Sequence, residues 1–434
     1  MSHNIFKELY KAKLMFPELA VKKVQSGFTI GGSLGLNYPP ALGSALCRRY
    51  RELENVRIIQ SLSVMPQPFM EQPEMKGCFF TQSTFFGRAE REGAKLGLAG
   101  FDPEHMSMSS KMTSRNHHIN IYWTTVSSMD RHGFMTVGGG SVHDLIYIKA
   151  ADMIMVEVNE NLPRFIGDAL LHIRDVDCVV ENTAPLFQMP VRKVSEKDRT
   201  IGRYVAELVE DGATIQLGIG SIPNAVCSEL LQKKDLGVHT EMLHDGMVDL
   251  YEAGAITNRK KTYYPGRMTA AFGLGTDKLY NFMHENFGIY MQDSSVNADE
   301  VTVGKNYKQV SINTALTVDL SGQICSESLG TVQYSGTGGA LDYTRGARRS
   351  EGGKAIMALY STVKNDTVST ITAVLPPGAA VTIPRADVHY IITEYGIANL
   401  QSKTLTERAR ALISIAHPDF RKELEHEARR LGIL

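Results

Sequence analysis

The stretch IGRYVAELVEDGATIQLGIGSIPNAVCSELLQKKDLGVHTE, residues 201–241, decides the fold class. Apolar residues first recur with helical spacing, then run together in ATIQLGIG, recur again in IPNAVCSELLQ and run together once more in LGVHTE. Short apolar runs are typical of strands that are covered on both faces, and helices between such strands make them parallel. The stretch therefore predicts a helix–strand–helix–strand unit of an α/β protein.

The first half of the chain has the same order of elements. An amphipathic segment that ends at Gly27 is followed by the apolar run FTIGG, a helical pattern after Pro40 and the strand-like VRIIQSL at 56–62. Gly27 precedes Pro40 by thirteen residues and Gly212 precedes Pro223 by eleven, so the spacing nearly repeats. We interpret the repeat as an internal duplication, which predicts two similar open α/β domains with mostly parallel, partly mixed sheets.

The polar stretch VRKVSEKDRT at 191–200 is the best candidate for a domain boundary, so we expect one domain at 1–192 and another at 193–434. Residues 308–328 predict antiparallel strands around a turn at Ser321-Gly322, and residues 407–430 predict two helices with a break at Pro418. Further apolar runs predict strands at 152–159, 355–361, 379–384 and 388–394.

The composition is that of a globular protein with enough length for two domains: 434 residues, 43% hydrophobic and 21% charged. A formal net charge of -1 gives no global field for nucleic acid or an anionic membrane surface, so any anionic ligand must be held locally. The five cysteines form no CxxC pair, which argues against a disulfide framework and a thiolate zinc site. No signal peptide or membrane span is evident, and we expect a cytoplasmic protein.

The segment QLGIGSIPNAV at 216–226 ends a strand at Gly218-Ile219-Gly220 and starts a helix, with Ser221 near the N-cap and Pro223 in the first turn. Glycines allow a ligand to approach the backbone closely, and free N–H groups at a helix start favour negative charge. A tight strand-to-helix turn that merely needs small residues is the alternative interpretation.

Glu241 lies one strand after this turn, so in a right-handed βαβ unit it belongs beside the turn at the carboxyl edge of the sheet. A carboxylate at the end of a buried strand loses hydration, which is costly unless the charge has a use. The matching place in the first half, around Gln60 and Ser61, has no carboxylate. The alternative is a structural glutamate that is satisfied by an arginine or a backbone amide.

A metal site at His239, Glu241 and His244 is not favoured. HTEMLH lacks the H-E-x-x-H spacing, and a strand followed by a turn does not place both histidines on one helical face.

A second glycine-rich element, YSGTGGALDYTRGARR, occupies residues 334–349, and its three closely spaced glycines make backbone amides accessible. Three arginines follow and could bind the phosphates of a ligand, but a flexible surface loop with solvated arginines is an equally simple interpretation. Glu394 in TEYG is a second possible acid, although a structural carboxylate is the simpler interpretation. The glycines are Gly336, Gly338 and Gly339, and the arginines are Arg345, Arg348 and Arg349.

Together these segments resemble the acetyl-CoA hydrolase/transferase family of class I CoA-transferases, and within it the 4-hydroxybutyrate and butyrate CoA-transferases. The resemblance rests on QLGIGSIPNAV, HTEMLHDG at 239–246, SGTGGALDYTRGA at 335–347, and TEYGIANL with AHPDFRKEL near the end. It implies that Glu241 is the catalytic glutamate. It also implies that coenzyme A contacts Gly218, Ile219, Gly220, Ser221, Ile222, Asn313, Gly336, Gly338 and Gly339.

The resemblance further implies transfer of CoA from a short-chain acyl-CoA to a short carboxylic acid through a glutamyl-CoA thioester. Acyl-CoA and the acid would be substrates, with no permanently bound cofactor and no metal, and the enzyme would be a homodimer that binds neither nucleic acid nor membranes. An acyl-CoA hydrolase, in which water captures the intermediate, remains an alternative. A non-catalytic acyl-CoA-binding regulator on the same scaffold is another.

Overall fold

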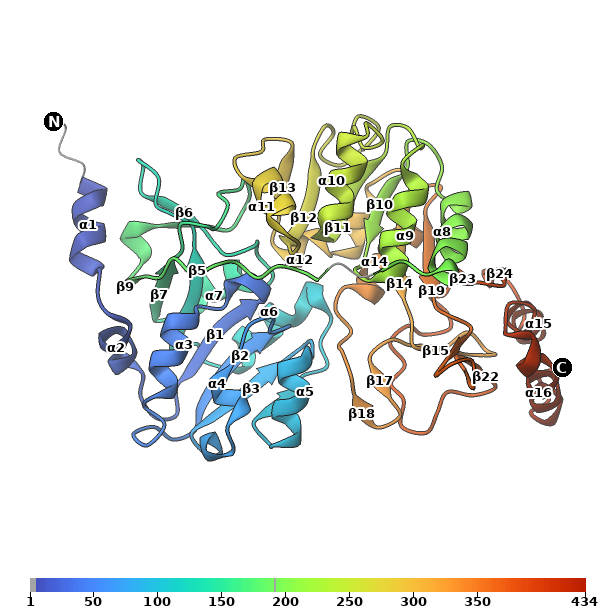
Figure 1. Cartoon of the computed structure of the whole chain (residues 1–434), viewed down its shortest axis with the longest axis horizontal. Helices are drawn as coiled ribbons and strands as arrows, with labels where there is room; N and C mark the ends of the chain where they lie inside the picture. Colours follow the sequence, from blue (N-terminus) through green and yellow to red (C-terminus); the bar gives the residue numbers. More distant parts are fainter. Residues whose placement is uncertain (1–4, 191–192) are drawn as a thin grey trace. The chain divides into compact units, whose positions relative to one another are not determined.

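The structure is a computed structural model that describes residues 5–190 and 193–434. Contacts divide the chain into two compact units, which are described separately below (Figure 1). The first comprises Met1–Met189 and Ala270–Val296, and the second comprises Pro190–Thr269 and Asn297–Leu434. We expected a domain boundary after residue 192. Residues 191–192 lie outside the described residues, so the division at this point stays a prediction.

The first unit is built on a seven-stranded sheet in the order β4-β3-β2-β1-β5-β7-β9. All of its pairings are parallel, as the apolar strand runs predict. Strands β6 (Phe134–Thr136) and β8 (Leu170–His172) form a separate antiparallel pair. The strands of the main sheet are β1 (Thr29–Leu34), β2 (Val56–Ser61), β3 (Phe79–Ser83), β4 (Ala99–Phe101), β5 (Ile121–Val126), β7 (Met153–Val158) and β9 (Cys178–Glu181).

Helices of the first unit follow the strands in sequence, as a parallel sheet requires. One core cluster forms around the buried side chains of Ile30, Ile58 and Trp123, which come from three strands of this sheet. The helices are α1 (Ile5–Lys13), α2 (Pro17–Ala20), α3 (Pro40–Cys47), α4 (Pro68–Glu71), α5 (Arg88–Lys95), α6 (Met106–Asn116) and α7 (Asp144–Ala150), with α11 (Asp277–Met283) in the returning segment.

The second unit contains neighbouring strands in the order β11-β10-β14-β19-β23-β24. Pairings from β11 to β23 are parallel, and only β23 with β24 is antiparallel, so this sheet is mixed. The expected turn at Ser321-Gly322 joins the antiparallel strands β15 (Thr317–Asp319) and β16 (Ile324–Cys325). The antiparallel prediction is wrong for the start of the same segment, because residues 309–314 form a parallel strand between β10 and β19. The sheet strands are β10 (Thr214–Leu217), β11 (Gly237–Leu243), β14 (Gln309–Thr314), β19 (Lys354–Ala358), β23 (Tyr390–Thr393) and β24 (Gly396–Asn399).

Helices α9 and α14 pack against β14, and α8 packs against β19, β23 and β24. The two C-terminal helices, α15 and α16, are separated by a break at His417. The side chain of His417 accepts a hydrogen bond from the N–H of Asp419 and caps α16. The helices are α8 (Glu196–Leu208), α9 (Ser221–Leu230), α10 (Asp245–Glu252), α13 (Glu300–Gly304), α14 (Ala340–Arg349), α15 (Leu405–Ser414) and α16 (Pro418–Arg430).

The order β2-β1-β5-β7-β9 in the first unit matches β11-β10-β14-β19-β23 in the second. The predicted α/β class with two similar, mostly parallel sheets is therefore confirmed. The strand predicted at 379–384 is wrong, because this segment makes only an isolated bridge from Ile383 to Ile324. Pro384 follows immediately and has no N–H with which to extend a ladder.

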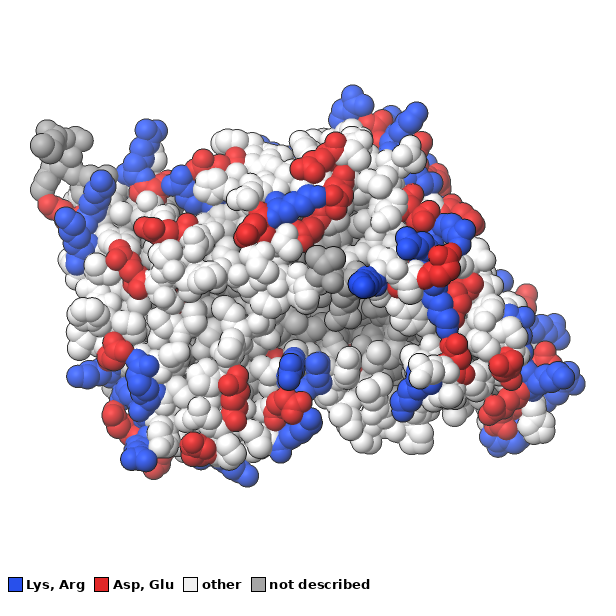
Figure 2. All heavy atoms as spheres, in the orientation of Figure 1, with Lys and Arg blue, Asp and Glu red and all other residues white. Residues whose placement is uncertain are grey.

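The exterior is of mixed charge, as the net charge predicts. On the face that Figure 2 shows, acidic and basic side chains are interspersed. Within residues 5–190 and 193–434, no helix is long and apolar enough to cross a membrane. All five cysteines are free thiols.

Candidate active site

The glycine turn after β10 presents open backbone. Gly220 caps α9 with a φ of +129°, a conformation that side-chain-bearing residues rarely adopt. A Cβ added at Gly218 would meet no atom within 4 Å. The Ile219 side chain between the two glycines is 42% exposed. The turn therefore has free space next to its backbone, as close approach of a ligand requires.

Glu241 lies on β11, beside the strand that leads into this turn. The parallel register pairs Ile215 with Val238, and continuing it by three residues places Glu241 level with Gly218. The Glu241 side chain is half-buried, and its Oε2 accepts a hydrogen bond of 3.0 Å from the N–H of Gly339. The structure thus joins the predicted carboxylate directly to the second glycine-rich element, 98 residues further along the chain.

The hydrogen-bonding N–H lies at the start of a helix. Gly339 is the N-cap of α14, so the carboxylate of Glu241 faces the positive end of the helix dipole. A Cβ at Gly339 would lie 2.4 Å from Oε2 of Glu241 and 3.0 Å from the ring of Tyr343. A side chain at this position would therefore displace the Glu241 carboxylate. Gly336 and Gly338 are buried with it, and Gly338 has a φ of +53°.

Burial raises the pKa of Glu241 to about 7, the N–H of Gly339 opposes the rise, and the nearby charge of Asp342 adds to it. A carboxylate with this pKa is poorly solvated yet still ionised to a useful extent at neutral pH. Such a group is a candidate nucleophile or general base.

Asn313 is the remaining predicted contact, and its half-buried side chain lies in a polar network on β10 and β14. Its Nδ2 donates to Ser311 Oγ at 2.9 Å, and its Oδ1 accepts from Gln216 Nε2 at 3.2 Å. Ser221 Oγ is 2.8 Å from the hydroxyl of Tyr360, which donates to Asp198. These contacts fix both side chains from within the second unit, and their contact with coenzyme A stays a prediction.

Comparison with known proteins identifies the family. The acetyl-CoA hydrolase/transferase N-terminal domain matches residues 2–189, and the C-terminal domain of the same family matches residues 275–428. The chain belongs to the acetyl-CoA hydrolase/transferase family.

Relatives within the family match nearly the whole chain. The chain is 41% identical to the succinyl-CoA:cyclohexane-1-carboxylate CoA transferase of Geobacter metallireducens, over 98% of this chain and 97% of the relative. It is 38% identical to the 4-hydroxybutyrate coenzyme A transferase of Clostridium kluyveri, over 97% of this chain and 98% of the relative. The crystal structure of RipA from Yersinia pestis covers 99% of this chain and 100% of its own, with 35% identity and a TM-score of 0.94.

The three arginines after the second glycine element do not lie in a loop. They occupy α14, and each forms an ion pair with an acidic side chain. Arg345 and Arg348 pair with Asp387, while Arg349 pairs with Glu300. The loop interpretation is therefore wrong, because the arginines lie on a helix that ion pairs connect to its neighbours, and the phosphate interpretation stays a prediction.

Glu394 fits its structural interpretation. Its two oxygens accept hydrogen bonds from the N–H and the hydroxyl of Ser361, both at 2.8 Å, and Lys197 lies 3.5 Å away.

His239 is fully buried and serves the structure of the strand. Its Nε2 lies 2.8 Å from the carbonyl oxygen of Asn297, and its Nδ1 lies 2.9 Å from Thr269 Oγ1. Burial lowers the pKa of His239 to about 3, so the ring is neutral at physiological pH. Among the residues that the structure describes, no group of three or more His, Cys, Asp or Glu side chains is placed to hold a metal.

Sequence reasoning missed Tyr343, whose fully buried ring packs beside both Gly339 and His239. Its hydroxyl donates to Asn297 Oδ1. The i, i+3, i+4 spacing of Tyr343, Gly346 and Ala347 could have indicated a buried face, but nothing in the pattern indicates that this face abuts Glu241.

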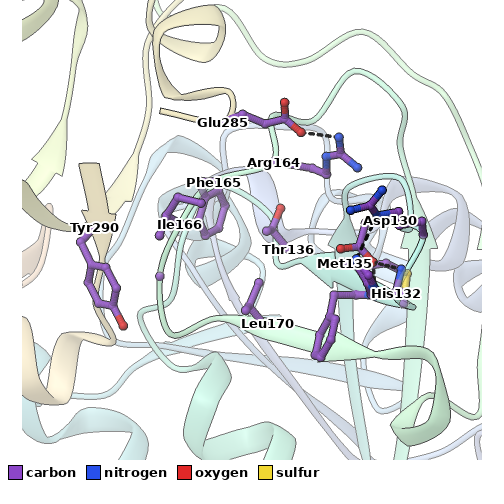
Figure 3. A pocket seen from close by; sticks show the side chains of 13 residues that line it. Asp130, His132, Met135, Thr136, Arg164, Phe165, Ile166, Leu170, Glu285 and Tyr290 are labelled. Carbon is purple, nitrogen blue, oxygen red and sulfur yellow. Dashed lines mark hydrogen bonds and ion pairs between the residues drawn. The ribbon is translucent and has the colours of Figure 1, made fainter. Parts of the chain in front are cut away.

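A separate cavity of about 620 Å³ lies in the first unit (Figure 3). Its wall is largely apolar, with Phe165 and Ile166 in the segment before β8 and Leu170 at the start of that strand. Its charged groups are satisfied within the wall: Arg164 pairs with Glu285, and Asp130 Oδ1 accepts from two backbone N–H groups. None of the predicted site residues lines it.

Proposed function

We propose that the protein is an acyl-CoA:carboxylate CoA-transferase in which Glu241 forms the covalent intermediate. The observation that supports this proposal most is the contact of Glu241 with the N–H of Gly339 at the start of α14, together with a pKa raised to about 7. The proposal also agrees with the CoA-transferase relatives, which match nearly the full length of the chain.

The proposed reaction proceeds by exchange of acyl groups at one carboxylate. An oxygen of Glu241 attacks the carbonyl carbon of the donor thioester, the C–S bond breaks, and a mixed anhydride and CoA thiolate form. The thiolate then attacks the glutamyl carbonyl, and the donor acid leaves as a carboxylate. The resulting glutamyl-CoA thioester reacts with the acceptor carboxylate through the same two steps in reverse.

Each addition places negative charge on a carbonyl oxygen. The N–H of Gly339 is directed at the Glu241 carboxyl group, so it is positioned to stabilise the oxyanion that forms on the glutamyl carbonyl. One such donor typically contributes about 3 to 4 kcal/mol. We assign CoA contacts to the open turn Gly218–Ile222, to Asn313 and to the glycines at 336, 338 and 339.

The proposed donors are acetyl-, butyryl-, 4-hydroxybutyryl- and succinyl-CoA, and the proposed acceptors are short carboxylic acids of the same size. Coenzyme A takes part as substrate, without a resident cofactor. We also propose a cytoplasmic homodimer that acts in short-chain fatty acid metabolism.

Trapping of the intermediate tests the proposal. The enzyme is incubated with acyl-CoA and no acceptor, then treated with borohydride, which reduces a glutamyl thioester to an alcohol, and peptides are mapped by mass. We expect donor-dependent modification at Glu241 and its loss in Glu241→Gln, with Glu394→Gln as the matched control that still becomes modified. Modification at another carboxylate would contradict the assignment, and rapid turnover without any added acid would identify a hydrolase instead.

A further inference from the structure

Glu327 is a buried carboxylate whose contacts lead towards the catalytic centre. It lies between β16 and β17 (Ser328–Leu329), is 5% exposed, and belongs to the second unit. Its Oε2 accepts hydrogen bonds from the hydroxyls of Thr337 at 3.0 Å and Thr382 at 2.9 Å. No lysine or arginine among the described residues forms an ion pair with it. Burial of a carboxylate with only hydroxyl partners is costly, so its presence requires an explanation.

The main chain of Glu327 contacts the same loop as its side chain. Its carbonyl oxygen accepts from the N–H groups of Tyr334 at 2.8 Å and Ser335 at 2.9 Å. The loop Tyr334–Thr337 is therefore bound at its start by the carbonyl of Glu327 and at its end by the carboxylate of the same residue.

The bound end of the loop lies two residues before the N–H that contacts Glu241. Gly338 separates Thr337 from Gly339 and has a left-handed φ of +53°, and the N–H of Ala340 closes the turn onto the carbonyl of Thr337 at 3.3 Å. Glycines give this turn more conformational freedom than other residues would, so an anchor is needed to fix the direction of the Gly339 N–H.

We propose that Glu327 is a positioning residue for the transfer reaction: through Thr337 it holds the N–H of Gly339 where that N–H binds Glu241 and its acylated forms. This inference rests on the proposed function, because it assigns a role to Glu327 in the chemistry of Glu241. Glu327 itself touches neither Glu241 nor the reacting atoms.

The test removes the anchor without removing bulk. Thr337→Val deletes the hydroxyl at nearly constant volume, Thr337→Ser keeps it, and Glu327→Gln replaces the charged acceptor with a neutral amide. Thr406→Val is the matched control, because it deletes a hydroxyl that donates to the carbonyl of Ile433 at 2.6 Å in the C-terminal helix pair of the same unit. For each variant, kcat/KM is measured against pH, and the rate of donor-dependent modification of Glu241 is measured by borohydride trapping.

We expect Thr337→Val to lower kcat/KM by about tenfold, the effect of one lost hydrogen bond. Glu327→Gln should lower it by a smaller factor, because the amide oxygen still accepts from both hydroxyls but more weakly than a carboxylate. The apparent pKa of the acid limb should rise, because a displaced Gly339 N–H no longer favours the ionised carboxylate. Asp342 and Tyr343 are the other titratable groups that face Glu241, and both remain in these variants. Thr337→Ser should restore the rate and the acid limb, and Thr406→Val should leave both unchanged.

Wild-type kcat/KM and an unshifted acid limb in both folded variants would overturn the role of Glu327. An equal change in Thr406→Val would also overturn it, because the effect would then be one of general stability. The proposed function is judged separately by trapping in the wild-type enzyme: if wild-type Glu241 is not modified, the covalent mechanism fails whatever the variants do. Should Thr337→Val not fold, Glu327→Gln with Thr337→Ser decides the result by the same two measurements.

Discussion

Gly339→Ala is the substitution that most directly perturbs the proposed nucleophile. The added Cβ would lie 2.4 Å from Oε2 of Glu241, whereas ordinary van der Waals contact begins near 3.4 Å, so the carboxylate must move by about 1 Å. A misplacement of this size can cost about 100-fold in rate, or about 2.7 kcal/mol of transition-state stabilisation. We therefore expect kcat/KM for acyl-CoA to fall by about 100-fold in steady-state CoA-transfer assays, while slow modification of Glu241 remains detectable by trapping.

The matched control for this prediction is Gly346→Ala on the same helix. Its Cβ would also lie 2.4 Å from a neighbour, but that neighbour is the apolar side chain of Val303. Overpacking of this kind typically costs about 1 to 3 kcal/mol of stability, which chemical denaturation measures. We expect Gly346→Ala to be less stable yet to retain wild-type kcat/KM per folded molecule. A folded Gly339→Ala enzyme with wild-type kcat/KM would refute the reasoning, because the carboxylate would then not depend on its position against Gly339.

Three further predictions follow from other parts of the second unit. The pKa of Glu241 is raised to about 7 and the ionised form attacks, so kcat/KM should fall roughly fivefold between pH 7 and pH 6. A flat profile of kcat/KM between pH 5 and pH 8 would contradict this. Gly218→Val adds bulk where no atom lies within 4 Å, so the fold should persist while KM for acyl-CoA rises about tenfold or more; an unchanged KM would place the turn outside the CoA site. Burial lowers the pKa of His244 to about 4, whereas the pKa of a histidine in the unfolded chain is about 6.5. The unfolded state therefore binds a proton more readily, and the folded state loses stability as pH falls from about 6.5 towards 4. His244→Asn keeps an acceptor at the N-cap of α10. In urea denaturation, the unfolding free energy of this variant should depend on pH less steeply than that of the wild type, by about 1.4 kcal/mol per pH unit. Equal slopes in the two proteins would show that His244 does not titrate in this way.

The elements of residues 201–241 could be predicted because their signals are local. Periodic apolar residues from Ile201 predicted α8, although the helix begins earlier, after the Ser195 cap. The two apolar runs predicted β10 and β11, whose residues are almost all buried. The glycine turn between them needs a left-handed residue at Gly220, which its sequence supplies. The parallel sheets follow from these units, since helices between strands leave no other connection.

The contacts of the site could not be predicted, because they join distant parts of the chain. Nothing near Glu241 in the sequence indicates that its hydrogen-bond donor lies 98 residues further on. Nor does the run of arginines reveal that they form ion pairs with Asp387 and Glu300, since both acids lie in other segments. The strand prediction at 379–384 is wrong for a related reason: its apolar run fits a strand, but Pro384 ends it after a single bridge.

The two units of the duplicated scaffold differ at the place that Glu241 occupies. In the first unit a glycine-rich loop also precedes a helix between two central strands, and the N–H of Gly139 donates to Oδ1 of Asn37 at 3.0 Å. In the second unit the N–H of Gly339 donates instead to Glu241. Both loops thus present a backbone donor. Asn37 follows β1, which matches β10, so its place is that of the glycine turn and not that of Glu241. The end of β2, which matches β11, carries Gln60 and Ser61 and no carboxylate. The scaffold provides the hydrogen-bond donor in either unit, and the reactivity that we propose arises only where its partner is an acid whose pKa burial raises to about 7.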